Sequence, residues 1–155
     1  MAIPTTVSIL KGVWQGISKL NYSEDPTVEN VSESDSSLRV DADAHQSFAN
    51  ITYTWEFEGE QHEGSLLLSG MSSRDEVTGG WVDSWHQSSS LMALKGTGMQ
   101  SDRVRLVGSY GAPGQPNWGW VVEIGVLHDE LEFKMINVSP DGVETWAVHA
   151  LYHRA

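Results

Sequence analysis

Hydrophobic and polar residues alternate along most of the chain, and turn-forming residues interrupt the alternation about every ten positions, a spacing typical of antiparallel sandwiches and barrels. Side chains two apart on a strand share one face of a sheet. We predict strands at 11–19, 37–45, 48–57, 62–69, 77–87, 90–97, 103–110, 117–126, 130–138 and 143–153. Short turns rich in Gly, Asp and Pro, such as 58–61 and 139–142, favour pairing in sequence order. The pattern therefore predicts an all-β fold, a single antiparallel meander β-barrel of about ten strands.

Two segments break this rhythm. Residues 21–37 are rich in Ser, Glu, Asp and Asn, which predicts a solvated loop over one end of the barrel that could act as a lid. Residues 2–10 predict a short helix or an irregular plug, and 111–116 a second rim loop.

The more hydrophobic side of each strand should point inward. The inward sets are Leu38, Val40, Ala42 and Ala44; Ile51, Tyr53, Trp55 and Phe57; Trp118, Trp120, Val122, Ile124 and Val126; and Leu131, Phe133 and Met135. This assignment leaves Asp41, Asp43 and His45 outside, where they form a solvated face rather than a metal-binding set.

The chain has seven tryptophans, most of them in these strands. A large aromatic ring buries about 150–250 Å², so rings on one side of several strands require either a thick core or a cavity that a ligand fills. We expect Tyr53, Trp55, Trp81, Trp85, Trp118 and Trp120 to line the interior. Asp83 would be the polar handle of such a site, and His62 or His149 a second handle.

Asp83 lies between Trp81 and Trp85 at period two, so it should share their inward face, with His86 on the opposite face. A buried carboxylate needs partners. In one interpretation Asp83 lies near a rim and accepts hydrogen bonds from backbone amides or indole N–H groups. In the others it anchors a ligand or acts as a general acid or base.

Composition narrows the class of protein. The length of 155 residues fits one domain, 1–155, and the net charge of −12 disfavours nucleic acid and anionic membranes as partners. The lack of cysteine excludes disulfides and thiolate sites, and no apolar run approaches the roughly 20 residues of a membrane span. By default we expect a cytoplasmic protein. We also expect no cofactor or metal ion, because no dinucleotide, P-loop or zinc motif occurs.

Several short motifs carry a family resemblance: Gly12-Val13-Trp14-Gln15-Gly16, Trp81-Val82-Asp83, Pro140-Asp141-Gly142 and Leu151-Tyr152-His153-Arg154. Together they resemble a bacterial family of lipocalin-like domains of unknown function. The resemblance implies a calycin-type barrel in which Arg154, on the last strand, packs on Trp14, on the first, and closes one end.

The chain is also similar, more weakly, to nitrobindin-type haem barrels. That likeness implies a haem-ligating histidine near position 147, where this chain has Ala147, and makes His149 the nearest candidate. Alternation with Val148, Ala150 and Tyr152 favours His149 outside the barrel.

Four hypotheses follow. The first is binding of a small apolar or aromatic ligand inside the barrel, with a homodimer as an option on general grounds. The second is an enzyme that uses Asp83 and a histidine for isomerisation, cyclisation or hydration. The third is haem binding through His149, and the fourth is a barrel whose tryptophans only fill its core.

Overall fold

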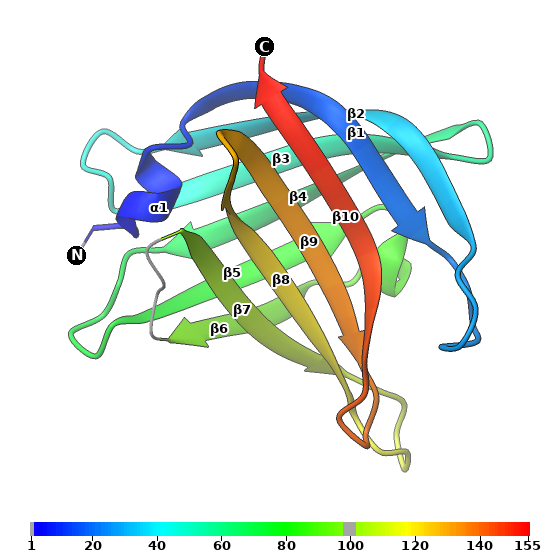
Figure 1. Cartoon of the computed structure of the whole chain (residues 1–155). Helices are drawn as coiled ribbons and strands as arrows, with labels where there is room; N and C mark the ends of the chain where they lie inside the picture. Colours follow the sequence, from blue (N-terminus) through cyan, green and yellow to red (C-terminus); the bar gives the residue numbers. More distant parts are fainter. Residues whose placement is uncertain (1, 98–101) are drawn as a thin grey trace.

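The protein, described by a computed structural model at residues 2–97 and 102–155, is a closed antiparallel barrel (Figure 1). Each strand pairs with its sequence neighbours, and the last pairs with the first. The strands are β1 Gly12–Asn21, β2 Val31–Ala42, β3 Phe48–Phe57, β4 Glu60–Ser69, β5 Glu76–Asp83, β6 Met92–Thr97, β7 Arg103–Tyr110, β8 Trp118–Leu127, β9 Glu130–Val138 and β10 Glu144–Arg154. A helix, α1 (Thr5–Ser8), precedes them, and a 3-10 turn, η1 (His86–Ser89), lies between β5 and β6. The predicted all-β meander barrel is confirmed.

Alternation places most of the predicted core. In β3, Ile51, Tyr53 and Trp55 are buried while Thr52 is exposed. In β8 and β9 residues of both faces are buried, and Ala44, predicted to point inward, is exposed because β2 ends before it and the chain turns there. On the outer side Asp43 lies in the turn after β2 and accepts hydrogen bonds from the backbone N–H groups of 45, 47 and 48. Asp43 therefore stabilises a turn between two strands.

The second strand begins earlier than the sequence indicates. β2 starts at Val31, so residues 31–37, predicted as loop, are strand and pair with β1. Most of these residues are polar and lie at or near the surface. The buried member, Ser36, has hydrogen-bond partners for its hydroxyl group in Thr54 O and Tyr152 Oη. A polar strand of this kind lacks the hydrophobic alternation on which the prediction depended.

One end of the barrel is closed by α1, which brings Val7 and Leu10 into the core (Figure 1). Beside it the Arg154 guanidinium lies 4.4 Å from the centre of the Trp14 ring. Arg154 also donates to Lys11 O at 2.8 Å and Ile9 O at 2.9 Å, which ties the last strand to the helix. The predicted plug and the Trp14–Arg154 contact are both confirmed.

The outer face of β7 to β10 carries a charged network. Glu132 accepts from Arg103 Nη1 at 3.1 Å and lies 2.7 Å from His149 Nε2, and Arg105 bridges Glu123 and Glu144. Burial alone would raise the pKa of Glu132, but hydrogen bonds from His149 and Arg103 lower it overall. The network holds Glu132 ionised on the outside of the sheet.

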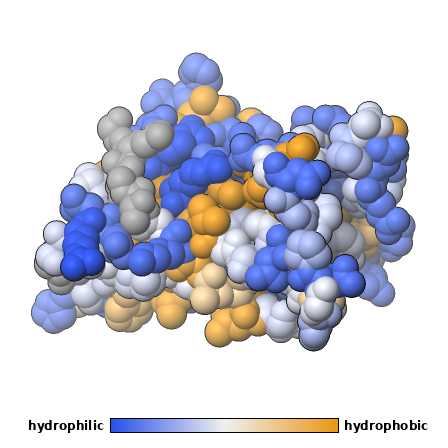
Figure 2. Space-filling view, turned by 90° about the horizontal axis from the view of Figure 1, so that it is seen from below, coloured by the Kyte–Doolittle hydropathy of each residue, from blue (hydrophilic) through white to orange (hydrophobic). Residues whose placement is uncertain are grey.

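Hydrophobic residues also reach the surface, as Leu91 and Val107 do. Figure 2 shows hydrophobic groups near the middle of the face seen from below, bordered by hydrophilic ones. Within the described ranges, the only helical segments are far too short and polar to cross a bilayer.

Candidate ligand-binding site

Aromatic side chains gather at the end of the barrel opposite α1, which we call the mouth. β3 and β5 end there, and β4 and β8 begin there, because neighbouring strands run in opposite directions. The aromatic cluster consists of Trp55, His62, Trp81, Trp85, His86 and Trp120. Its members come from β3, β4, β5, β8 and the turn after β5, and all except His86 are residues that the sequence analysis assigned to the interior.

The His86 imidazole lies in the middle of the cluster. Its ring centre is 5.6 Å from that of Trp55, in a stacked arrangement, 5.7 Å from Trp81 and 5.5 Å from Trp120. The Trp85 indole packs edge-on against it at 4.8 Å. One imidazole is thus surrounded by four indoles.

This position of His86 differs from the prediction, which put it on the face opposite Trp81. The strand ends at Asp83, not at 87, and the following turn carries His86 into the interior. Burial, with a smaller contribution from nearby His62, lowers the pKa of His86 to about 4, although Asp83 opposes the shift. The serine run 88–90 is the one sequence signal that could have indicated an earlier end to the strand.

Asp83 is the polar centre of the site and is 1% exposed. Its Oδ2 accepts from Tyr53 Oη at 2.7 Å and Trp55 Nε1 at 3.2 Å. Its Oδ1 accepts from the backbone N–H groups of Trp85 at 2.8 Å and His86 at 3.1 Å. Trp81 Nε1 in turn donates to Tyr53 Oη at 2.9 Å. The carboxylate thus organises the tryptophans and fixes the turn after β5.

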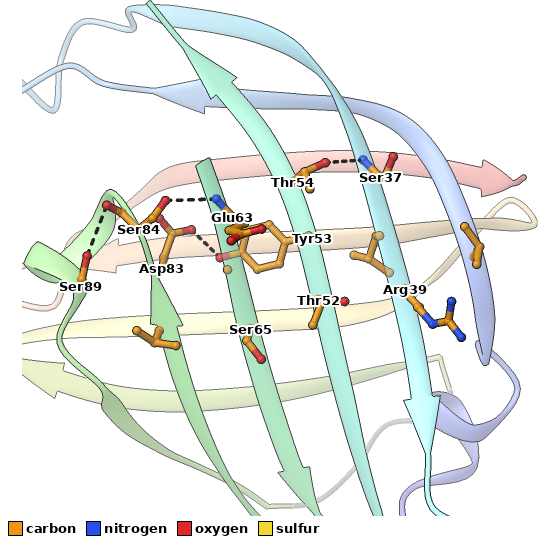
Figure 3. Close-up of a pocket in the computed structure, with 14 residues that line it drawn as sticks. Ser37, Arg39, Thr52, Tyr53, Thr54, Glu63, Ser65, Asp83, Ser84 and Ser89 are labelled. Atoms are coloured by element: carbon orange, nitrogen blue, oxygen red, sulfur yellow. Dashed lines mark hydrogen bonds between the residues drawn. The ribbon is translucent and has the colours of Figure 1, made fainter. Parts of the chain in front are cut away.

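A glycine makes this arrangement possible. Tyr53, Gly64 and Asp83 form one row across β3, β4 and β5. A Cβ at Gly64 would overlap the Tyr53 phenol, which crosses β4 at this point to reach the carboxylate (Figure 3). Burial, followed by the charge of Asp83, raises the pKa of Tyr53 well above its ordinary value, so the phenol stays protonated and donates.

Two of the predicted interior tryptophans lie at the rim instead. Trp85 and Trp118 are each 39% exposed. Trp85 follows the end of β5 and packs against Phe57 and Trp55, while Trp118 is the first residue of β8. Both are at the mouth because their strands end or begin there.

The two predicted histidine handles lie in different places. His62 lies at the mouth, where its ring is 4.8 Å from that of Trp55 and its Nδ1 is 3.1 Å from Ser84 Oγ. His149 lies outside, beside Glu132, as alternation in β10 favours. A one-residue irregularity in β10 falls between Trp146 and Val148, next to Ala147.

Trp120 carries a polar group that the fold leaves unused. The side chain is 5% exposed and stacks on Trp81 with ring centres 5.3 Å apart. Its Nε1 is the one fully buried side-chain nitrogen or oxygen in the described part of the chain without a hydrogen-bond partner. Most buried polar groups in proteins are paired, so this donor stands out.

The interior beside the cluster is nearly full. A hollow lined by Asp83, His86, Phe133 and other core residues has a volume of about 10 Å³, enough for no more than one water molecule. Sites for small molecules commonly measure about 300–1,000 Å³. In this conformation side chains occupy most of the space that the sequence analysis assigned to a ligand.

A larger depression, of about 610 Å³, lies on the outer side of β1 to β5. Figure 3 shows hydroxyl-bearing side chains such as Thr52 and Ser65 along it, with Arg39 to one side. It includes Tyr53 and Asp83, whose side chains are buried on the other side of the sheet. The aromatic cluster and this depression are therefore separate features.

Residues 6–154 match a family model described as "Protein of unknown function (DUF1579)". The chain belongs to this family. A solved structure with a similar fold, titled "Crystal Structure of Rv2717c from M. tuberculosis", has a TM-score of 0.62 and 18% sequence identity, with 99% of each chain covered. At that identity the likeness shows the fold alone. The comparison with curated proteins gives no match.

In this DUF1579 chain the site is built for packing and hydrogen bonding. The four donors to Asp83 occupy both its oxygens, and within the described ranges neither ring nitrogen of His86 bonds to it. Proton transfer between a carboxylate and an imidazole requires direct contact or one bridging water. The arrangement holds one flat ring, that of His86, between four indoles, and it leaves the Trp120 N–H group without a partner among the described residues.

Proposed function

We propose that this DUF1579 protein binds a small, largely apolar or aromatic molecule at the mouth of the barrel, within the aromatic cluster. The observation that carries the proposal is the convergence of four indoles, from three separate segments of the chain, on one ring-sized position, where the buried N–H of Trp120 has no partner. A lipocalin-like use of the barrel, with the ligand entering at one end, is part of this proposal.

The geometry supports binding over core filling for a physical reason. A purely structural core gains nothing from a buried unpaired donor, which costs about 1–3 kcal/mol. At the opposite end, the buried indole nitrogen of Trp14 has a partner, because its Nε1 donates to Leu10 O at 2.8 Å. Moreover, two cluster residues, Trp85 and His86, come from a turn rather than from the barrel wall, so they can leave without unpairing strands.

Titration with a neutral apolar fluorophore such as Nile red tests the proposal. We expect saturable binding with a blue-shifted, stronger probe emission, because the indoles exclude water. Trp85→Leu should weaken this binding about tenfold, since an indole that packs at the site contributes on the order of 1–2 kcal/mol.

The matched control is Trp146→Leu. Trp146 is also a partly exposed tryptophan, but its Nε1 donates to Glu29 at 3.0 Å, and in the described part of the chain its ring contacts no ring of the aromatic cluster. This variant should bind the probe as the natural protein does. Absence of saturable binding, or equal losses in the two variants, would contradict the proposal.

A further inference from the structure

The occupant of the aromatic cluster indicates what its ligand looks like. We infer that the His86 imidazole occupies the place of the ligand, and that the ligand is a flat, neutral heteroaromatic ring whose hydrogen-bond acceptor pairs with Trp120 Nε1 once His86 has swung out. This inference rests on the proposed function and names the ligand class of the same site.

Shape is the first argument. The cluster already holds a flat, nitrogen-containing ring, stacked on Trp55 at an interplanar angle of 30° and bounded by Trp81, Trp85 and Trp120. Indole faces favour offset-stacked and edge-on aromatic neighbours. His86 also walls the small hollow beside Asp83, so its departure would join the two spaces.

The unused donor is the second argument. His86 satisfies the shape of the site but not its hydrogen bonding, because Trp120 Nε1 stays unpaired although the two ring centres are 5.5 Å apart. A ring with an acceptor at the right edge would pair with this donor. That added hydrogen bond gives the ligand an advantage over His86.

Charge is the third argument. The small hollow beside His86 is lined by one acidic side chain, that of Asp83, and by no Lys or Arg among the described residues. The whole chain carries a net charge of −12. An anionic ligand would meet repulsion without a compensating cation, so the ligand class is neutral.

The turn that carries His86 has the backbone of a segment able to open. Gln87, Ser88 and Ser89 have φ values of 57°, 50° and 61°, a left-handed conformation that is costly for residues with a side chain. The turn is held closed by the two backbone N–H groups on Asp83 Oδ1 and by Ser89 Oγ, which donates to Ser84 O at 3.3 Å (Figure 3). Opening would relieve the strain and expose the cluster.

The test compares quinoline with naphthalene at neutral pH, two rings of the same shape of which only quinoline carries an acceptor. Binding is followed by NMR of the tryptophan indole N–H groups, with the Trp120 signal assigned as the one missing in Trp120→Phe. Quinoline should bind about tenfold more tightly and move the Trp120 signal downfield, since it pairs a buried donor. In Trp120→Phe the two compounds should bind equally, and naphthalene-2-carboxylate should bind worst to the natural protein.

His86→Gly provides the second measurement. If the imidazole competes with the ligand, its removal should strengthen quinoline binding at least several-fold, whereas loss of a purely structural residue should weaken it. His86→Ala serves the same purpose should the glycine variant fail to fold.

The outcomes separate the two proposals. Nile red binding that depends on Trp85, together with equal affinities for quinoline and naphthalene or weaker binding in both His86 variants, would overturn the ligand class and leave the proposed function standing. Failure of every aromatic probe with the natural protein and the His86 variants alike would overturn both.

Discussion

At the scale of single residues, the mouth depends on what Asp83 and His86 require of their surroundings. A buried carboxylate must be paired, and Asp83 obtains two of its four donors from β3 and the other two because the chain turns immediately after it. The same turn inserts His86 between indoles, where the neutral imidazole is favoured by burial. The turn that supplies donors to Asp83 thus also places the His86 ring where burial favours its neutral form.

This coupling predicts a specific pH dependence. His86 has a pKa of about 4 in the folded protein and about 6.5 when unfolded, so between these values the unfolded chain binds a proton that the folded protein does not. Stability should therefore fall as the pH drops from about 6.5 to about 4, by up to about 3 kcal/mol from this residue. Two nearby groups act on the pKa of His86 in opposite directions: Asp83 raises it and His62 lowers it.

Urea unfolding across this pH range measures the effect. His86→Phe should remove most of the slope, whereas His153→Phe, an exposed histidine variant, should keep it. Protonation of Glu132 also destabilises the protein in acid, because the pKa of Glu132 is lowered in the folded state. The decisive quantity is therefore the difference between the pH slopes of the two variants. Equal slopes would show that His86 is not buried as a neutral ring.

At the scale of elements, the contact between β3 and β5 across β4 depends on a glycine in β4. Tyr53 on β3 reaches Asp83 on β5 only because β4 has Gly64 between them. The sequence predicts the inward faces of Tyr53 and Asp83 from alternation, but it does not show that they pair. Alternation fixes which face a residue shares, but which residue lies opposite it on the next strand also depends on the turn between the two strands.

Gly64→Ala should therefore be strongly destabilising. The new methyl group would displace the phenol from Asp83, and overpacking of this kind typically costs about 1–3 kcal/mol, with the lost hydrogen bond in addition. Gly80→Ala is the control, because a Cβ at Gly80, on β5, would make an ordinary 3.5 Å contact with Leu91. Thermal unfolding should separate the two variants by several degrees, and similar melting temperatures would contradict the role assigned to Gly64.

Elements also show where sequence reasoning fails. The hydrophobic strands can be located from the sequence because runs of alternating apolar residues, such as the one in β3, match one buried face. The first half of β2 was missed because both its faces are polar, and the end of β5 was missed because Trp85 continues the alternation past Asp83. In both cases the backbone pairing, and not the side-chain pattern, determines where the strand begins or ends.

At the scale of the whole molecule, the two ends of the barrel differ. The α1 end is closed by Trp14, Arg154 and hydrogen bonds to the main chain, whereas the mouth is closed by a short turn with a left-handed backbone. In the binding proposal the mouth is therefore the end through which the ligand enters. The sequence predicted the fixed end from a family resemblance, but it could not predict that His86 closes the other.

Hydrogen exchange should reveal this asymmetry. Amides of residues 84–91 should exchange through local opening, and those of 13–17, paired on both sides in β1, only through much larger unfolding. Mass spectrometry of peptic fragments measures both segments in one experiment. Equal protection of the two segments would argue against an opening turn.

The pairing of β1 with β10 affects how the chain folds during its synthesis. Residues 12–21 remain without one of their two partners until residues 144–154 emerge from the ribosome, since these two segments close the sheet. Until then both margins of the growing sheet can hydrogen-bond to other chains, a recognised route to aggregation. Efficient production of this protein will therefore depend on how quickly β10 docks on β1 once its residues have been synthesised.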